Sequence, residues 1–573
     1  MKNKELAEMF EQIADVLEFQ NEMPFKVNAY RKASRILQDL DRDIEEIWQA
    51  GELEKIPGIG SGLAKKIDEY LRTGRMTKYE EVVRQVPSSL IELMKIQNLG
   101  PKTLALANKE LGVKTLEDLK RVIADGSLSR LPGMGEKKVQ NILRGMELYE
   151  QAQERISIAE ALPIAERVVS QLRGHPAVER ISPAGSLRRM RETVGDIDIL
   201  VATRKGKNVI EAFTHLPQVR EVLAAGETKG SVIVEEGRQV DLRAVQPESF
   251  GAALQYFTGS KAHNVHLRDI AKRAGLKVNE YGIFRDGEKL GGREEAEIYA
   301  VLGMDWIPPE MREDRGEIDL ALEHNLPRLI ELKDLRGDLH VHSRYSDGHF
   351  SIPELVEAAK SLGYTYLGVC DHSQSARYAQ GLDERGLRQK LEEIRRLNEQ
   401  LTDFRVLAGA EVDVLADGSL DYPDELLAEL DIVIAAIHSG FKQNVTERIT
   451  AAMENPNVLI FAHPTGRLIS RREGYEVDLD RILEAAQRTG TVLEINSYYD
   501  RLDLNDTNAR RAADMGILLA INTDAHLLDH LHMIKFGVGV ARRAWLQPQQ
   551  IINTWPVEKI LELKERKRKK LAG

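Results

Sequence analysis

The sequence lacks cysteine pairs and long apolar runs, and each absence narrows its interpretation. Its 573 residues contain one cysteine, Cys370, which rules out an internal disulfide and fits a reducing cytoplasm. No apolar run approaches the roughly 18 residues that span a bilayer. The N-terminal stretch MKNKELAEMF has no signal-peptide core. We therefore expect a cytoplasmic protein without a membrane segment.

An excess of positive charge is also absent. The formal net charge is −11, which argues weakly against nucleic acid as a partner. That objection fails if acidic residues cluster in metal sites while basic residues form local patches, so total charge leaves the question open. The composition, 42% hydrophobic and 30% charged, is typical of a globular protein. The length predicts several domains, about four.

Residues 1–150 carry apolar residues at helical spacing and three similar short turns. Each turn contains glycine and opens a helix, which aims unpaired N–H groups outward, where a phosphate or cation can complete them. One such turn is most often an ordinary helical hairpin, but three in one region favour helix-hairpin-helix motifs, which they resemble and which hold a DNA backbone without reading sequence. The candidate DNA-binding residues are Gly58, Gly60, Lys66, Gly100, Lys102, Gly133 and Gly135.

The stretch GSLRRMRETVGDIDIL, residues 185–200, combines metal and phosphate chemistry. Asp196 and Asp198 are two apart in an apolar run, so in a strand they share one face. Adjacent carboxylates repel unless a cation lies between them, and such oxygen ligands suit Mg²⁺ or Mn²⁺. Gly185-Ser186 predicts a helix start that, with the following arginines, makes a place for phosphate. Asp241, in RQVDLRAV, is a third candidate carboxylate on a strand.

These motifs, followed by YFTGS at 256–260 and VNEYGIF at 278–284, resemble the DNA polymerase X family. The resemblance covers residues 1–315 in the order lyase-like domain, fingers, palm and thumb. It implies that Asp196 and Asp198 bind two metal ions, Mg²⁺ or Mn²⁺, and that Asp241 joins them at the catalytic ion. The nucleotide-binding residues that it implies are Gly185, Ser186, Arg189, Gly195, Tyr256, Phe257, Gly259 and Asn264.

The chain departs at two positions from the pattern of polymerase beta, the best-known member of this family. Lys261 stands where polymerase beta has Asp, which bears on packing against the incoming base. Lys66 matches the lysine that forms a Schiff base with a 5′-deoxyribose phosphate, and Lys26 and Tyr30 match its surroundings. At the position of a second lysine of that site, this chain has Gly62. Because a Schiff-base lysine needs charged neighbours, a plain phosphate contact by Lys66 is favoured over lyase activity.

The C-terminal part repeats a pattern of apolar strand, polar strand end and helix. DLHVH (338–342) begins it, and YLGVCDH (366–372), VLAGAE (406–411), IVIAAIH (432–438), VLIFAH (458–463) and ILLAINTDAH (517–526) continue it. This order predicts a parallel β/α barrel with its site at the C-terminal ends of the strands. A single histidine there is more often a packing residue, but six of them together with Asp347, Glu411 and Asp524 favour a metal centre.

This segment resembles the PHP (polymerase and histidinol phosphatase) domain over its whole length. The resemblance implies a distorted barrel of about seven strands and three divalent metal ions, Zn²⁺, Mn²⁺ or Fe²⁺, which suit mixed imidazole and carboxylate ligands and hydrolyse phosphoesters. The implied ligand groups are His340, His342, Glu411 and Asp524; Glu411, His438 and His463; and Asp347, His372 and His526.

We therefore expect a multidomain α/β protein that polymerises DNA in repair, filling short gaps. Its PHP domain is expected to hydrolyse DNA phosphodiesters as a 3′→5′ exonuclease or at abasic sites. The alternatives are a nucleotidyltransferase fused to a small-molecule phosphatase, and a DNA-end-binding scaffold with inactive sites. The expected partners are gapped or nicked DNA and dNTPs, and the expected state is a monomer. The expected domains are lyase-like (1–85), fingers (86–150), palm (151–245), thumb (246–315), linker (316–332) and PHP (333–573).

Overall fold

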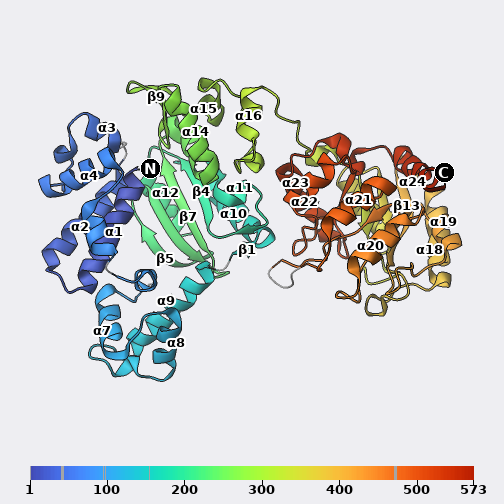
Figure 1. The fold of residues 1–573 in the computed structure, drawn as a ribbon, viewed down its shortest axis with the longest axis horizontal. Helices are drawn as coiled ribbons and strands as arrows, with labels where there is room; N and C mark the ends of the chain where they lie inside the picture. Colours follow the sequence, from blue (N-terminus) through green and yellow to red (C-terminus); the bar gives the residue numbers. More distant parts are fainter. Residues whose placement is uncertain are drawn as a thin grey trace. The chain divides into compact units, whose positions relative to one another are not determined.

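The chain folds into two compact units. The computed structural model describes residues 2–40, 44–84, 86–94, 96, 98–153, 155–469 and 474–572. The first unit comprises Met1–Ile156, Pro163–Gly185 and Gly195–Trp306, and the second comprises Ser157–Leu162, Ser186–Val194 and Ile307–Gly573. Figure 1 shows the elements of both.

The N-terminal part of the first unit is helical, as its periodicity predicts. α1 and α2 pack along each other, and the side chains of Leu6, Phe10 and Ile13 are fully buried in this core. Helices of this part are α1 (Lys2–Phe19), α2 (Pro24–Asp39), α3 (Ile44–Gln49), α4 (Ser61–Thr73), α5 (Thr77–Val83), α6 (Ser88–Leu93), α7 (Pro101–Leu111), α8 (Leu116–Ala124) and α9 (Glu136–Gln153).

A five-stranded sheet follows, with the strand order β2-β4-β7-β6-β5. β4 and β7 run parallel, and the other neighbouring pairs run antiparallel. Helix α12 (Gly206–Thr214) packs against β5, β6 and β7, as Figure 1 shows. The strands are β2 (Arg180–Pro183), β4 (Ile197–Ala202), β5 (Val219–Ala225), β6 (Lys229–Val234) and β7 (Gln239–Val245).

The first unit ends with helices and a small antiparallel sheet of order β10-β9-β8. Helix α13 contacts β4, and α14 contacts β8, so this part is built on the five-stranded sheet. Its elements are α13 (Phe250–Thr258), α14 (Lys261–Arg273), β8 (Lys277–Asn279), β9 (Gly282–Arg285), β10 (Glu288–Gly291) and α15 (Glu295–Val301).

The second unit contains a parallel sheet of seven strands that follow one another in sequence order. The strands are buried along almost their whole length, which is typical of a parallel sheet covered on both faces. They are β11 (Gly337–Val341), β12 (Tyr366–Val369), β13 (Arg405–Asp413), β14 (Ile432–Ala436), β15 (Ile460–Phe461), β16 (Val492–Asn496) and β17 (Leu519–Asn522).

The sheet nearly closes into a barrel, because the chain after β17 returns to β11. Asp524 N donates a hydrogen bond to His340 O, and His342 N donates one to Ala525 O, each at 2.9 Å. The predicted parallel β/α barrel is thereby confirmed. Helices of this unit are α16 (Glu317–Leu322), α17 (Ile352–Ser361), α18 (Glu384–Asn398), α19 (Asp424–Glu429), α20 (Val445–Glu454), α21 (Leu479–Thr489), α22 (Asp506–Asp514), α23 (Ile534–Arg543) and α24 (Val557–Ala572).

Among the helices that the structure describes, the apolar stretches are too short for any of them to cross a membrane.

Candidate metal centres and DNA-binding turns

Two carboxylates lie side by side on the five-stranded sheet. Asp198 of β4 is in register with Asp241 of β7, and paired residues of neighbouring strands point to the same face. Asp196 directly precedes β4, and its side chain is exposed. Gly195 lies between β3 (Thr193–Val194) and Asp196. The structure therefore brings Asp198 and Asp241 together, with Asp196 at the entry of the same strand.

Gly185 makes room for the Asp198 carboxylate. A Cβ atom on Gly185 would lie 2.6 Å from Asp198 Oδ2, and the φ angle of Gly185 is +61°, which glycine adopts without steric cost. The neighbouring Ala184 N donates a hydrogen bond to Asp198 O at 2.8 Å. Gly185 begins α11 (Gly185–Arg188), so the predicted helix start is present in a helix of one turn.

Lys229 supplies a positive charge to Asp241, and our sequence interpretation missed it. Lys229 Nζ lies 3.1 Å from Asp241 Oδ2, and Gln239 Nε2 donates to Asp241 Oδ1 at 2.9 Å. Burial acts to raise the pKa of Asp241, but the Lys229 charge and the hydrogen bonds outweigh it and lower that pKa. Asp241 is therefore ionised, as a metal ligand must be. The signal for Lys229 is the register of β6 with β7, which residue types alone do not specify.

The segment Ser186–Val194 belongs to the second unit and is held by other residues of that unit. Arg467 donates to both Glu192 carboxylate oxygens, at 3.0 and 2.6 Å. Arg543 Nη1 donates to Arg189 O at 2.9 Å. Arg189, expected to bind a triphosphate, is paired through Nε with Glu313 Oε1 at 3.1 Å, and burial lowers its pKa. These contacts fix the backbone that carries the predicted phosphate-binding residues.

The predicted nucleotide-binding residues of α13 and α14 lie close together. The rings of Tyr256 and Phe257 pack edge to face with centroids 5.0 Å apart, and Gly259 directly follows α13. Asn264 accepts from Gln255 Nε2 at 2.7 Å and donates to Tyr256 O at 2.8 Å. Both ends of the Asn264 amide are thus used internally, so contact with a base edge requires exchange of these bonds. Lys261, at the departure from the polymerase beta pattern, is exposed.

The three predicted turns share one geometry. Gly58 has a φ angle of +95° and Gly133 of +75°, and Asn98, at the same place in the second turn, has +67°. Asparagine tolerates this left-handed conformation better than most residues. The glycine that directly precedes each helix faces open space, since no heavy atom lies within 4 Å of an added Cβ; these residues are Gly60, Gly100 and Gly135. A nucleic-acid backbone can approach all three helix starts closely.

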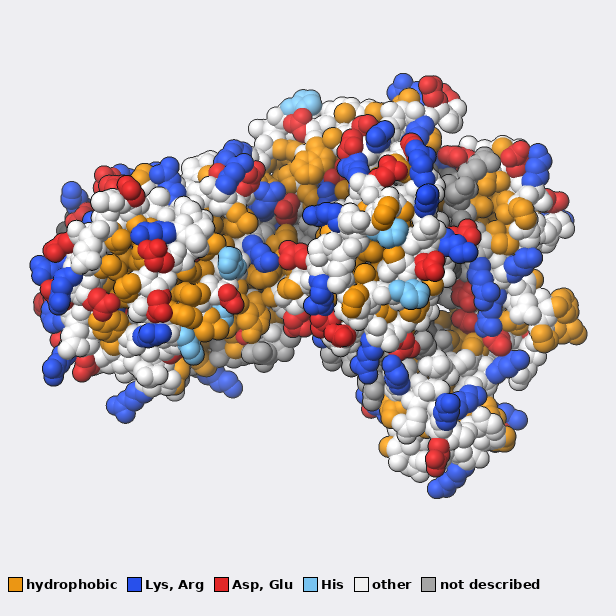
Figure 2. All heavy atoms as spheres, turned by 180° about the vertical axis from the view of Figure 1, so that it is seen from behind, with side chains coloured by type: hydrophobic (Ala, Val, Ile, Leu, Met, Phe, Trp, Pro, Cys, Tyr) orange, Lys and Arg blue, Asp and Glu red, His pale blue; other side chains and the backbone are white. Residues whose placement is uncertain are grey.

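Of the lysines near the first two turns, Lys102 is exposed and Lys66 is partly buried. Lys66 Nζ donates to Gly62 O at 2.9 Å, and Lys102 Nζ lies 3.8 Å from Glu18 Oε1. On the face drawn in Figure 2, acidic and basic side chains are interspersed. The net charge of −11 therefore forms no single repulsive field on that face, and local lysines remain accessible.

The nine predicted metal ligands of the barrel converge at the C-terminal ends of its strands. Three groups have ligand atoms within 4.8 Å of one another, and the first matches the predicted group in full. The predicted trio of Asp347, His372 and His526 is joined by His342. The groups are His340, His342, Glu411 and Asp524; His342, Asp347, His372 and His526; and His372, Glu411 and His438.

Glu411 belongs to two of these three groups and also contacts His463, the predicted ligand that none of them contains. Its Oε1 lies 3.0 Å from His463 Nε2 and 3.4 Å from His438 Nε2. Its Oε2 lies 2.9 Å from His372 Nδ1 and 3.5 Å from His340 Nε2. The carboxylate of Glu411 therefore contacts imidazoles from more than one of the ligand groups.

The centre fits metal ions, because several buried atoms lack any other partner. Among the described residues, Glu411 Oε2, His342 Nδ1 and His372 Nδ1 make no contact that has hydrogen-bond geometry, and the 2.9 Å approach of Glu411 Oε2 to His372 Nδ1 does not have it either. Buried polar atoms left unpaired are costly unless a cation lies between them. Imidazole and carboxylate donors together suit Zn²⁺, Mn²⁺ or Fe²⁺.

The electrostatics of the centre favour bound positive charge. Burial opposes the charging of His438, but carboxylates, chiefly Glu411, raise its pKa to about 10. Burial also opposes the charging of His526, but its bond to Asp347 raises its pKa to about 9. Burial, together with repulsion from neighbouring imidazoles, lowers the pKa of His342 to about 4. An environment that draws protons onto two imidazoles equally attracts divalent cations.

A second layer of carboxylates orients the imidazoles, and our sequence interpretation missed it. Glu494 Oε1 lies 2.8 Å from His340 Nδ1, and Glu494 Oε2 accepts from His463 N at 2.9 Å. Asp413 Oδ1 lies 2.6 Å from His438 Nδ1. Such contacts set the tautomer and aim the other ring nitrogen at the metal. The available signal was a charged residue inside each apolar strand run, VLEIN and GAEVD.

The loop that carries Asp347 is supported by a buried ion pair. Lys390 Nζ lies 2.9 Å from Asp371 Oδ2, and both side chains are fully buried. Asp371 accepts hydrogen bonds from the backbone and hydroxyl of Ser343 and from the Ser346 hydroxyl, each at 2.8 Å. The pair therefore holds residues 343–346 directly before Asp347 and fixes the position of that ligand.

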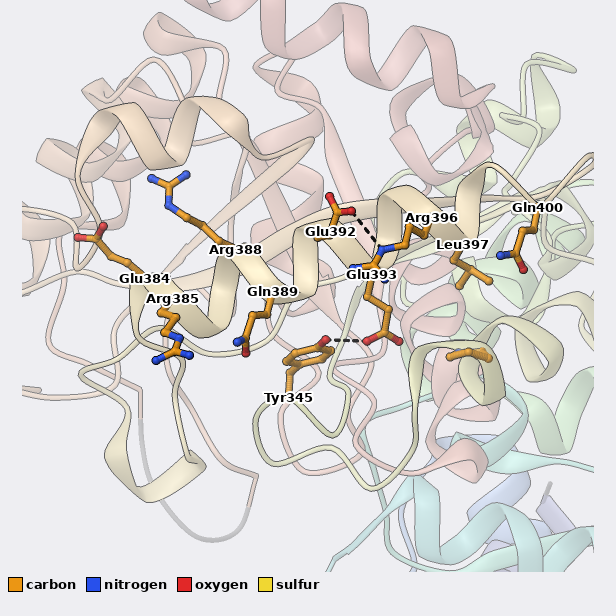
Figure 3. Close-up of a pocket in the computed structure, with 11 residues that line it drawn as sticks. Tyr345, Glu384, Arg385, Arg388, Gln389, Glu392, Glu393, Arg396, Leu397 and Gln400 are labelled. Atoms are coloured by element: carbon orange, nitrogen blue, oxygen red, sulfur yellow. Dashed lines mark hydrogen bonds and ion pairs between the residues drawn. The ribbon is translucent and has the colours of Figure 1, made fainter.

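A hollow of about 990 Å³ runs along α18 (Figure 3), and none of the nine ligands lines it. Its charges are of both signs and largely satisfy one another. Arg396 pairs with Glu392, and Tyr345 donates to Glu393 Oε2 at 2.6 Å. The groups do not converge on one point, so we assign no binding site to this hollow.

Four family models match separate stretches of the chain. The match to the PHP domain contains seven of the nine predicted ligands and ends before Asp524 and His526. The two helix-hairpin-helix matches lie in the first unit, and the thumb match begins there and continues past Trp306. The four models are the Helix-hairpin-helix domain (1–76), the SAM-like Helix-hairpin-helix tandem (90–147), the DNA polymerase beta thumb (253–313) and the PHP domain (338–498).

Curated relatives align with all or part of the chain. It is 41% identical over 560 residues to the DNA polymerase/3′-5′ exonuclease PolX of Bacillus subtilis (strain 168), covering 96% of this chain and 97% of that protein. DNA polymerase lambda of Rattus norvegicus is 24% identical over 343 residues, 54% of this chain and 56% of that protein. A probable phosphatase of Thermoanaerobacter sp. (strain X514) is 29% identical over 251 residues, 41% of this chain and 97% of that protein.

Proposed function

The chain belongs to the family X DNA polymerases that carry a PHP domain, and on this premise we propose that it fills short gaps during DNA repair and trims 3′ ends. Family membership makes it an enzyme with nucleotidyltransferase and nuclease activity. We propose further that the protein acts as a monomer on gapped or nicked DNA, with dNTPs as substrates.

The register pair of Asp198 and Asp241 is the observation that carries the synthetic half of the proposal. These carboxylates and Asp196 would hold two ions of Mg²⁺ or Mn²⁺. Such ions, when bound, activate a primer 3′-hydroxyl and neutralise the charge of the triphosphate and its leaving group. Gly185 keeps the Asp198 carboxylate close to the backbone, and Lys229 keeps Asp241 ionised.

The nucleotide is held by residues that precede the three carboxylates in the sequence and by residues that follow them. Ser186, Arg189 and the Gly195 backbone bind the triphosphate, and Arg189 exchanges its pairing with Glu313 for phosphate oxygens. Tyr256, Phe257 and Gly259 pack against the sugar, and Asn264 reaches the minor-groove base edge. The edge-to-face packing of the two aromatic rings supports this wall.

The three helix-hairpin-helix turns hold the DNA backbone on both sides of the gap. The open space at the glycine before each helix supports close approach of a phosphate to the helix N–H groups. We assign Lys66 to a phosphate contact, since its ammonium bonds to a backbone carbonyl and Gly62 supplies no second charge. We propose the boundaries 1–85, 86–150, 151–245, 246–315, 316–332 and 333–573 for the lyase-like, fingers, palm, thumb, linker and PHP parts.

The nine ligands of the barrel would hold three divalent ions for phosphodiester hydrolysis. When bound, such ions would supply a hydroxide nucleophile near neutral pH and stabilise the attacking and the leaving oxygen of the phosphodiester. Glu411 would be a ligand shared between ions, and Glu494 and Asp413 hold the imidazoles of His340 and His438 in orientation. The substrate bond is the terminal phosphodiester at a DNA 3′ end, and cleavage at abasic sites uses the same centre.

A small-molecule phosphatase activity is the alternative for the barrel. The similarity to the probable phosphatase covers 41% of this chain, so it bears on the barrel alone. The helix-hairpin-helix and thumb matches favour DNA as the substrate that both centres share.

Primer extension on gapped DNA tests the proposal. The full-length protein is incubated with a one-nucleotide gap, a 5′-labelled primer and either Mg²⁺ or Mn²⁺. With dNTPs we expect extension by one nucleotide, and without dNTPs shortening of the same primer from its 3′ end. Failure to extend in either metal contradicts the synthetic assignment. Faster release of phosphate from a small phosphomonoester than shortening of DNA favours the phosphatase alternative.

A further inference from the structure

An exposed aromatic ring stands beside the metal ligands of the barrel. The side chain of Tyr378 is 71% exposed, an unusual state for so large an apolar ring. Its ring centroid lies 6.2 Å from that of His372 and 6.3 Å from that of His438. The ring therefore lies beside these two imidazoles but too far away for its hydroxyl-bearing side chain to be counted among the metal ligands. A substrate bound at the metal centre would contact this ring.

The loop that presents this ring is anchored to the metal centre. Ser375 Oγ donates to Asp413 Oδ2 at 2.7 Å, and Asp413 in turn holds His438. Leu382 N donates to His372 O at 2.8 Å, where the loop returns. Ala376 and Ala379, on either side of the ring, are fully buried. An anchored ring loses little further freedom when it contacts a substrate, which favours binding.

The position of the ring suits one part of a nucleotide. A nucleobase is separated from its phosphate by a single sugar, so a phosphate among the imidazoles carries its base to a point just beside them. An aromatic face stacks on every base with similar strength. An exonuclease must accept any terminal nucleotide, and sequence-tolerant stacking meets that requirement better than hydrogen bonding to base edges does.

We propose that Tyr378 stacks on the base of the 3′-terminal nucleotide while the terminal phosphodiester lies at the metal centre. Tyr378 is thereby a specificity-determining residue that gives the barrel its preference for nucleic-acid ends over small phosphoesters. This inference rests on the proposed nuclease function of the barrel.

The test compares two DNA ends with three variants of the full-length protein. One 5′-labelled single strand ends in a normal nucleotide, and the other ends in an abasic residue with the same phosphodiester. Tyr378→Ala and Tyr378→Leu should raise the KM for the normal end about 10-fold, the size expected for one lost base–aromatic stack. Both variants should leave the KM for the abasic end unchanged. Tyr378→Phe keeps the ring and should match the wild type on both ends.

Two controls separate stacking from damage to the centre. The metal content per chain should be equal in the wild type and in all three variants. Arg385→Ala, an exposed change in the α18 hollow of Figure 3, should leave both KM values unchanged.

The outcomes separate the stacking role of Tyr378 from the nuclease function of the barrel. A wild type that shortens both ends, with Tyr378→Ala equal to it or impaired equally on both, overturns the stacking role alone. A wild type that shortens neither end overturns the proposed nuclease function, and the stacking role with it.

Discussion

Asp198 and Asp241 are register partners on the parallel strands β4 and β7. Their carboxylates share one face of the sheet, and the Asp198 carboxylate fits closely over the Cα atom of Gly185. Lys229 supplies the countercharge to Asp241 at 3.1 Å. Two ionised carboxylates on one face repel unless a cation lies between them, so this arrangement is built for metal ions.

The first helix-hairpin-helix turn separates DNA contact from folding. Gly60 has open space around an added Cβ, whereas a Cβ on Gly58 would lie 2.5 Å from Ile36 Cδ1 at a φ angle of +95°. We expect Gly60→Val to keep the thermal midpoint and weaken gapped-DNA binding roughly 10-fold, or about 1.4 kcal/mol. Gly58→Val should lower the thermal midpoint, because its backbone conformation is strained for valine. Fluorescence anisotropy and calorimetry measure the two effects, and unchanged affinity in Gly60→Val would exclude this turn from the DNA contact.

Substitutions of Glu411 and of Asp347 should differ in how many metal ions the protein loses. Glu411 lies within reach of ligands from more than one group, whereas Asp347 belongs to one group with His342, His372 and His526. We expect Glu411→Gln to lose two ions per chain and Asp347→Asn to lose one, because the amide removes the charge and one oxygen ligand. Metal content after dialysis, measured by mass spectrometry, checks this. Equal losses in the two variants would mean that Glu411 bridges no ions.

The Arg467–Glu192 ion pair should matter for nucleotide binding. It holds the segment that carries Ser186 and Arg189, and its two side chains are 18% and 24% exposed. We expect Arg467→Ala to raise the KM for dNTPs roughly 5-fold, the effect of about 1 kcal/mol. The kcat of extension and the shortening of single-stranded DNA should stay the same.

Charge reversal controls for general damage to this region. Arg467→Glu combined with Glu192→Arg should recover part of the lost dNTP affinity, while either reversal alone should not. A double variant no better than the single ones would show that the pair does not position the segment.

Lys567 of α24 should make the stability of the barrel depend on pH. Its side chain is 2% exposed, and its ammonium contacts Thr491 Oγ1 at 2.7 Å. Burial lowers the pKa of Lys567 from 10.5 to about 7. Between these values the unfolded state binds a proton that the folded state lacks, so stability rises with pH. From pH 7 to 9 we expect the wild type to gain about 2 kcal/mol relative to Lys567→Met.

Calorimetric unfolding of the full-length protein at both pH values checks this expectation. Lys569→Met, which changes an exposed lysine of the same helix, should follow the wild type at both. A difference between the wild type and Lys567→Met that does not change with pH would mean that the oxygen acceptors around Lys567 keep its ammonium charged.

The sequence was sufficient to predict the fold class and the clustering of the barrel ligands. Alternation and strand-end positions are local patterns, and they placed residues such as His340 and Glu411 at one end of a parallel sheet, where they also lie in the structure. The contact of Lys229 with Asp241 could not be predicted, because it depends on the register of β6 and β7. The pairing of Arg467 with Glu192 depends on tertiary packing between distant segments. The role of Glu494 could have been predicted, since a charged residue inside a buried strand needs a hydrogen-bonding or charged partner.

The central claim, that one chain holds two separable metal centres of opposite chemistry, is tested most directly in a single reaction. A 5′-labelled primer on gapped DNA is followed with and without dNTPs. Asp198→Ala with Asp241→Ala should reduce extension at least about 1000-fold, since metal stabilisation is worth several kcal/mol, and should leave 3′ shortening intact. His340→Ala with His342→Ala should abolish shortening and leave extension. Retained extension in the first variant, or loss of both activities in either, would contradict the account.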